Sequence, residues 1–289
     1  MDKYALLKHL PFERFKSPPP RVAVLRLTGV IGSMGPMRRG LTMAGMAPFI
    51  ERAFKLPRLE AVALTINSPG GSPVQSALIA RRIRDLAAEK EVPVLGFCED
   101  VAASGGYWLA CAADEIFVQP SSIIGSIGVI SAGFGFPALL ERYGIERRVH
   151  TAGDKKSILD PFKAEDPKEV ARLKSLQKEI HRDFIAAVKD RRGTRLTGKD
   201  ATLFSGEFWS GAKAIELGLV DGEGELRHTL RQRYGEKVEM KVIEDGRPWI
   251  KRRLGLLAPG DFGAAQPADW AGGLLAAAEE RALWARYGL

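Results

Sequence analysis

The feature that most constrains the fold is an alternation of β-branched apolar runs with segments of helical periodicity, which starts directly after three prolines at positions 18–20. Such an alternation is typical of βαβ units and of a mostly parallel sheet. We therefore predict an α/β fold with a mostly parallel sheet. The expected strands cover residues 22–31, 61–67, 92–98, 115–118 and 147–151.

Helices are expected between and after these strands. Ser72 followed by Pro73 has the pattern of an N-cap with proline at the first helical position, so a helix should begin there and run to about Ala88. Apolar residues at helical spacing predict an amphipathic helix over residues 166–192. Further helices are expected over residues 206–220 and 268–287, with one more strand over 238–243.

Composition divides the chain of 289 residues into an N-terminal extension (1–20), one domain (21–244) and a C-terminal tail (245–289). The extension has no apolar run of signal-peptide or membrane-spanning length, so we expect a cytoplasmic protein. The tail carries a basic and apolar patch at residues 249–254. This patch is a candidate for peripheral contact with the inner face of the membrane, and a contact between subunits or within the tail is an equally good alternative.

The chain is basic and poor in cysteine. A formal net charge of +8 and a pI of about 9.5 favour an anionic partner. No run of Lys and Arg is interleaved with aromatic side chains, which argues against a nucleic-acid groove. Cys98 and Cys111 are too few for a disulfide framework or a metal site, and we expect both to be buried thiols.

Two turns rich in small residues follow predicted strands. The first reads NSPGG at residues 67–71, and the second reads AASGGYW at residues 102–108 and places Ser104 at a helix start. Small neighbours let a peptide carbonyl approach, and free amides at a helix start can stabilise an oxyanion. A serine in this position is most often only an N-cap. The second turn favours a nucleophile, because parallel strands bring their carboxyl ends to one edge of a sheet.

A serine nucleophile needs a base. The four histidines lack an obvious partner pattern and are expected to be surface or structural residues, with His150 the least poor candidate: His9, His150, His181 and His228. A lysine can serve when burial lowers its pKa. Lys155 and Lys156 stand just before an apolar segment at residues 158–162, although either lysine could equally be a solvated loop residue.

Five motifs in order resemble the peptidase domain of the signal peptide peptidase A family, also called protease IV: INSPGG, AASGGYW, SIIGSIGVIS, AGDKKSILDPF and FWSGAKAIELGLVDGEG. The resemblance covers roughly residues 21–230 of the predicted domain. It implies a crotonase-like or ClpP-like spiral of ββα units and a serine peptidase that works through an acyl-enzyme without metal or organic cofactor. Remnant signal peptides or other unfolded apolar peptides are the implied substrates. A homo-oligomeric ring is also implied, with the serine and lysine of one site supplied by neighbouring subunits.

The resemblance assigns roles to individual residues. Ser104 is implied to be the nucleophile, Lys156 rather than Lys155 the base, and Ser126 the residue that orients the lysine amine. The amides of the second glycine in each turn are implied to form the oxyanion hole. Apolar walls predict a primary pocket for apolar or small side chains. The expected oxyanion and substrate-binding residues are Gly71 and Gly105, and Gly70, Tyr107, Ile127 and Val129, respectively.

Other functions are open to a chain of this fold. An acyl-CoA hydratase or isomerase would need glutamates at the oxyanion site, and the motif around Ser104 has no carboxylate. A non-catalytic scaffold would have lost site residues, all of which are present here. A Ser/His/Asp peptidase resembling ClpP would need a histidine near Ser126 in the sequence, and none lies there. These comparisons favour the serine-lysine peptidase.

Overall fold

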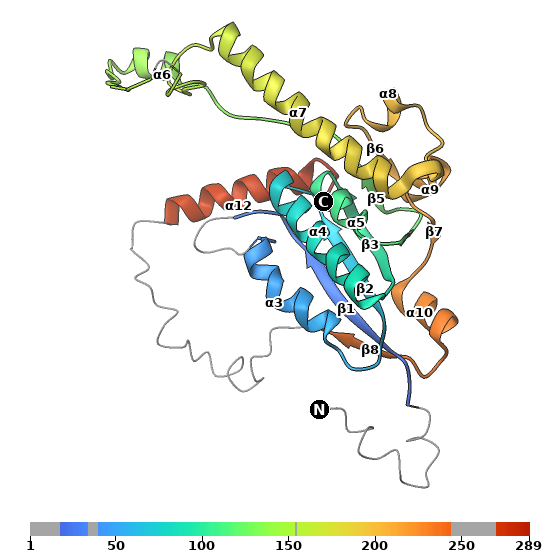
Figure 1. The fold of residues 1–289 in the computed structure, drawn as a ribbon. Helices are drawn as coiled ribbons and strands as arrows, with labels where there is room; N and C mark the ends of the chain where they lie inside the picture. Colours follow the sequence, from blue (N-terminus) through green and yellow to red (C-terminus); the bar gives the residue numbers. More distant parts are fainter. Residues whose placement is uncertain (1–17, 34–39, 154, 244–269) are drawn as a thin grey trace, which may run out of the picture.

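The computed structural model describes residues 18–33, 40–153, 155–243 and 270–289 (Figure 1). In these residues eight strands form one sheet in the order β6-β5-β3-β2-β1-β8, with β4 beside β3 and β7 beside β4. All neighbours are parallel except β5 and β6. The predicted α/β fold with a mostly parallel sheet is confirmed. The strands are β1 (Arg21–Thr28), β2 (Leu59–Ser68), β3 (Val94–Ala103), β4 (Glu115–Val118), β5 (Ile123–Gly125), β6 (Phe208–Ser210), β7 (Gly222–Glu223) and β8 (Glu239–Val242).

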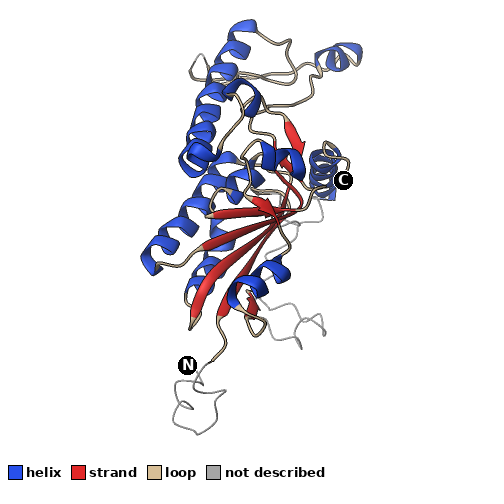
Figure 2. Cartoon of the chain, turned by 90° about the vertical axis from the view of Figure 1, so that its right-hand side faces the viewer, coloured by secondary structure: helices blue, strands red, loops and turns tan. Residues whose placement is uncertain are grey.

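Helices lie on both sides of this sheet (Figure 2). Helices α3, α4 and α5 enclose the larger core with one face of the central strands, and α10 contributes Leu230 to a smaller core on the other face. None of the described helices combines the length and the apolarity needed to cross a membrane. The helices are α3 (Met43–Phe54), α4 (Pro73–Lys90), α5 (Gly105–Ala110), α6 (Pro137–Arg142), α7 (Pro167–Arg192), α8 (Asp200–Leu203), α9 (Gly211–Glu216), α10 (Leu226–Tyr234) and α12 (Trp270–Ala285), with a 3₁₀ turn, η1, at Gly193–Arg195.

Local capping signals predicted helix starts correctly. The Ser72 hydroxyl accepts a hydrogen bond from the Gln75 amide at 3.4 Å, with Pro73 at the first helical position of α4. The Asp166 carboxylate likewise accepts from the Lys168 amide at 2.8 Å at the start of α7. Such caps are readable because a side-chain oxygen satisfies a backbone donor two or three residues away.

Two predicted elements are wrong. Residues 147–151 form no strand; they are exposed coil, since no other strand lies beside them to accept their backbone hydrogen bonds. The expected helix over residues 206–220 divides into β6, which pairs antiparallel with β5, and the short helix α9. Helix α3 and strands β5 and β7 were not predicted. The basic and apolar patch at residues 249–254 lies outside the described residues.

An arm formed by residues 129–166, together with the first half of α7, leads away from the sheet (Figure 1). The buried residues of α7 are Phe184, Val188 and Arg192, all in its second half. Large apolar side chains of the arm are exposed, which is unusual for a free surface and typical of a contact with another chain. These side chains are Ile130, Phe134, Phe136, Leu139, Tyr143, Ile145 and Val149.

A buried ion pair fixes the end of α7 to the core. The Arg192 side chain is 1% exposed, and it donates to both carboxylate oxygens of Asp221 at 2.7 and 3.1 Å. The Ile116 amide donates to the same carboxylate at 2.7 Å. Burial acts to raise the pKa of Asp221, but the hydrogen bonds from Arg192 and Ile116 outweigh it, so this pKa lies below its ordinary value of 3.8.

We expect Asp221→Asn to lower the free energy of unfolding at neutral pH by about 3 kcal/mol, because the Arg192 guanidinium stays buried without its counter-charge. The control Glu216→Gln removes an exposed pair with Lys213 and should cost less than about 0.5 kcal/mol. Since the folded-state pKa of Asp221 is lowered, its contribution is complete above the unfolded value of 3.8 and is lost as the pH falls through the folded value. Urea unfolding at neutral and acidic pH measures both effects; equal losses from the two substitutions would contradict the prediction.

Candidate active site

Ser104 stands where β3 meets α5, in a backbone conformation that L-residues rarely adopt. Its φ is +53° and its ψ is −123°. The Ser104 amide donates to the Gly125 carbonyl at 2.8 Å, and the Ser104 carbonyl accepts from the Tyr107 and Trp108 amides. The hydroxyl makes no capping hydrogen bond, although Ser104 occupies the N-cap position. A strained serine with an uncommitted hydroxyl at a strand-to-helix turn is typical of a nucleophile rather than of a simple cap.

Glycines let the first turn pack directly against this serine. A Cβ built on Gly70 would lie 2.7 Å from the Ser104 Cβ, and Gly70 has a φ of +102°. A Cβ on Gly106 would lie 2.4 Å from the Ser68 carbonyl oxygen. Both distances are too short for any larger residue, so the sequence pattern of small residues in the two turns is explained by their mutual contact.

Two backbone amides beside Ser104 are available to a ligand. The Ile31 amide donates to the Gly70 carbonyl and the Ser72 amide donates to the Ile31 carbonyl, each at 2.8 Å, which fixes the turn around Gly71. Within the described part of the chain, the amides of Gly71 and Gly105 have no acceptor. A Cβ on Gly105 would lie 3.4 Å from the Gly71 nitrogen, so the two glycines are adjacent. Free, adjacent amides next to a serine can stabilise an oxyanion.

Ile31 and Ser76 support this geometry and were missed in the sequence. Ile31 forms isolated bridges to Leu41 and to Gly71. Ser76 is fully buried, its hydroxyl donates to the Ser72 carbonyl at 2.9 Å, and a Cβ on Gly105 would lie 2.4 Å from it. A signal for Ile31 did exist, because the glycine at position 29 ends β1 before the predicted limit.

Ser126 lies in a turn directly after β5 and close to the nucleophile. Strand β5 pairs with β3 so that Gly125 is opposite Ala103. The Ser126 amide donates to the Glu207 carbonyl at 2.7 Å, which fixes a φ of +52°. The Ser126 hydroxyl accepts a hydrogen bond from the Tyr287 hydroxyl at 3.3 Å. The structure therefore brings together Ser126 and the turn that contains Ser104.

The same chain does not bring a lysine to this point. Lys155 and Lys156 lie in the arm and are exposed, and in the described residues neither contacts Ser104 or Ser126. The arm makes its hydrogen bonds within itself and with the start of α7, as when the Leu159 amide donates to the Glu169 carboxylate. A base from this arm therefore has to come from another copy of the chain or from a different position of the arm.

Two of the predicted pocket walls need correction. Tyr107 is fully buried, because the first turn of α5 directs its ring into the core, where its hydroxyl donates to the Leu219 carbonyl at 2.6 Å. Burial raises the pKa of this phenol well above its ordinary value. Ile127 is also fully buried. Neither side chain can line a substrate pocket, whereas Val129 keeps part of its surface exposed.

The described histidines and cysteines are not placed for catalysis. His150 and His228 are exposed, and His181 forms a hydrogen bond with the Ile127 carbonyl at 3.0 Å; His9 lies outside the described residues. Cys98 and Cys111 are buried free thiols, as predicted, and burial raises the pKa of Cys111 to about 12. Among the residues with assigned positions, no group of His, Cys, Asp or Glu has the geometry of a metal site.

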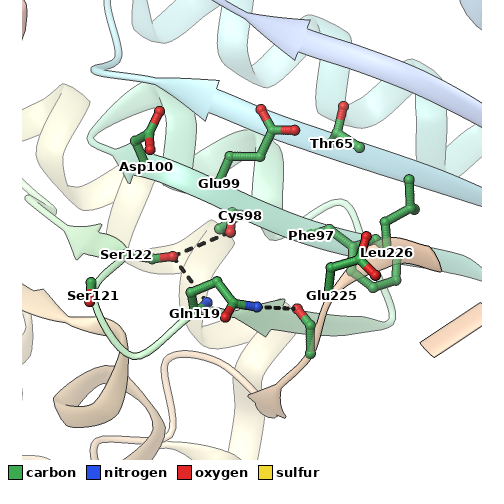
Figure 3. Close-up of a pocket in the computed structure, with 11 residues that line it drawn as sticks. Thr65, Phe97, Cys98, Glu99, Asp100, Gln119, Ser121, Ser122, Glu225 and Leu226 are labelled. Carbon is green, nitrogen blue, oxygen red and sulfur yellow. Dashed lines mark hydrogen bonds between the residues drawn. The ribbon is translucent and has the colours of Figure 1, made fainter. Parts of the chain in front are cut away.

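A cavity of about 380 Å³ opens elsewhere, beside the middle of β3 (Figure 3). The carboxylates of Glu99, Asp100 and Glu225 line it, and the Gln119 side chain donates to the Gly224 carbonyl at its edge. None of the predicted site residues lines this cavity. It is therefore separate from the serine site.

Relatives of this chain extend the comparison. The chain is 52% identical over 292 residues to the Na(+)/H(+) antiporter NhaA of Brucella abortus, an alignment that covers 98% of this chain and 39% of that protein. It is 29% identical over 245 residues to the chloroplastic serine protease SPPA of Arabidopsis thaliana, with 79% of this chain and 35% of that protein covered. The chain thus spans well under half the length of both. A lysine-to-alanine mutant of the 1510-N membrane-bound stomatin-specific protease in complex with a substrate peptide aligns with 83% of this chain and 100% of its own, at 17% identity and a TM-score of 0.49.

The family match covers the segment that holds the serine turn. Residues 87–240, a little over half of the chain, match the family described as Peptidase family S49. This segment contains Ser104, Ser126 and Lys156. The chain belongs to peptidase family S49.

Proposed function

We propose that this chain is a serine endopeptidase in which Ser104 is the nucleophile and Lys156 is the base. The observation that carries the proposal is the strained Ser104 at the start of α5, whose free hydroxyl lies beside the unbonded amides of Gly71 and Gly105. Membership of a peptidase family supports the same reaction class. A chain that used this turn only for structure would gain nothing from a strained serine.

The proposed reaction is acyl transfer in two steps. The neutral amine of Lys156 takes the proton of Ser104, whose oxygen attacks the peptide carbonyl, and the amides of Gly71 and Gly105 bind the resulting oxyanion. The C–N bond then breaks as the lysine ammonium returns its proton to the leaving amine. Water, deprotonated by the same lysine, hydrolyses the ester. Ser126 orients the lysine amine by a hydrogen bond.

We propose that each complete site forms between two copies of the chain in a homo-oligomeric ring. Lys156 is exposed on an arm that leads away from the sheet, and the apolar side chains of this arm have no cover in a single chain. Packing of the arm against a second copy would bury these side chains and remove water from the lysine. Lysine acts as a base only when its amine is desolvated, so assembly would also activate the site.

Unfolded apolar peptides, including remnants of signal peptides, are the proposed substrates. We further propose that the protein works on the cytoplasmic side of a membrane, in peripheral contact with it. Two observations support this location: the net charge of +8, which attracts anionic lipid, and the similarity to a Brucella protein named as an Na(+)/H(+) antiporter.

Cleavage by the purified chain tests the proposal. Wild type should cleave an unfolded protein and a fluorogenic apolar peptide, and Ser104→Ala should not. Ser121→Ala removes another hydroxyl, an exposed one, and serves as the matched control. If the oligomeric wild type cleaves neither substrate, or Ser104→Ala cleaves as well as wild type, the scaffold and acyl-CoA alternatives are favoured instead.

A further inference from the structure

The turn after α12 packs against the sheet at the serine site. Tyr287 is 9% exposed and forms a small core cluster with Val101 and Ala103 of β3. Its ring lies edge-on to the ring of Phe208, with the centroids 5.2 Å apart. Its hydroxyl donates to the Ser126 hydroxyl at 3.3 Å. The chain's C-terminal end lies near the edge at which the strands converge (Figure 2).

This position matters because the same strand ends carry the reacting groups. Ala103 directly precedes Ser104, and Gly125, opposite Ala103, directly precedes Ser126. The hydroxyl that Tyr287 contacts is the one proposed to orient the lysine amine. A phenol hydroxyl bonded there occupies space that the amine needs, so docking of Tyr287 and completion of the site oppose each other.

The surroundings of Tyr287 have the character of a side-chain pocket. Its walls are apolar, and a single hydroxyl, that of Ser126, stands where the ring ends. Pockets with apolar walls and one placed polar group select a ligand by shape and by that one hydrogen bond. The walls are Val101, Ala103, Ile123 and Phe208.

We propose that Tyr287 occupies, in its own chain, a substrate subsite that accepts aromatic side chains, and that residues 284–289 restrain the peptidase until a substrate displaces them. The inference rests on the proposed function and names its substrate preference and its regulation. A peptide that must first displace a docked segment binds with an affinity reduced by the fraction of molecules in which the subsite is open. Emptying the subsite therefore improves binding of aromatic peptides most.

Two readouts test the proposal on the full oligomeric chain. Fluorescein-labelled AAYAA and AAAAA peptides are titrated by fluorescence anisotropy against Ser104→Ala and against Ser104→Ala with Tyr287→Ala, so that binding is measured without turnover. Loss of the tyrosine should tighten AAYAA by about tenfold and AAAAA by less than about twofold. KM values for cleavage of the same peptides should shift in parallel when Ser104 is present. Tyr287→Phe should give a smaller shift, because only the hydrogen bond is removed.

The controls separate the possible outcomes. Arg286→Ala alters an exposed neighbour in the same segment and should leave both affinities unchanged. If Tyr287→Ala lowers the unfolding temperature but tightens neither peptide, Tyr287 is only a packing residue and the inference is overturned, even though wild type cleaves. If AAYAA binds more tightly to the emptied subsite while no variant cleaves any peptide, the subsite stands and the proposed function fails.

Discussion

Mixing equal amounts of Ser104→Ala and Lys156→Ala chains before assembly is expected to restore roughly a quarter of the wild-type activity, provided that each site combines two neighbouring chains in a closed ring. In such a ring half of the sites receive their serine from a chain that still has it. Half of those also receive an intact lysine from the neighbour. Each variant alone should lose at least about 10³-fold in kcat/KM, because the nucleophile and its base act as a unit.

The experiment needs variants that assemble normally. Both chains are unfolded together in urea, refolded as a mixture and compared with the separately refolded variants, with the size of each oligomer checked by light scattering. Lys155→Ala is the matched control, since it removes the adjacent exposed lysine of the arm and should remain active. Normal assembly without recovery in the mixture would show that the two residues do not act across a shared site.

The sequence predicted what depends on neighbours along the chain. The cap at Ser72 and the turn at Ser104 are set by a few consecutive residues, and both occur where the sequence indicated. The walls of the pocket were harder to predict, because an aromatic ring in an apolar helix packs inward or outward according to distant residues. Tyr107 packs inward because the Leu219 carbonyl, 112 residues away, accepts its hydroxyl.

Contacts between distant segments account for most of what was missed. Tyr287 meets Ser126 across 161 residues, and no local pattern marks this partner. Residues 147–151 have strand-like composition but no strand beside them, and a strand is stabilised by its pairing rather than by propensity alone. The position of Lys156 relative to Ser104 depends on assembly, which the sequence indicated only through a family resemblance.

Gly71→Ala is expected to lower kcat/KM by about 100-fold or more, because the added Cβ displaces one donor of the proposed oxyanion hole. The structure gives the reason directly. A Cβ on Gly71 would lie 2.0 Å from the Ile31 carbonyl oxygen, and Gly71 has a φ of +142°, a region that favours glycine. The turn has to move away from Ile31, and the strain should also cost about 2 kcal/mol of stability.

Gly222→Ala is the control for this prediction, since a Cβ there has no atom within 4 Å and its φ is not positive. Activity is expressed per folded molecule, with the folded fraction taken from circular dichroism at the assay temperature, so that unfolding is not counted as lost catalysis. The amide has to point at the oxyanion to within a fraction of an ångström for its stabilisation to count. A folded Gly71→Ala chain with activity within about tenfold of wild type would therefore exclude the Gly71 amide from the oxyanion hole and leave Gly105 as the donor to be tested next.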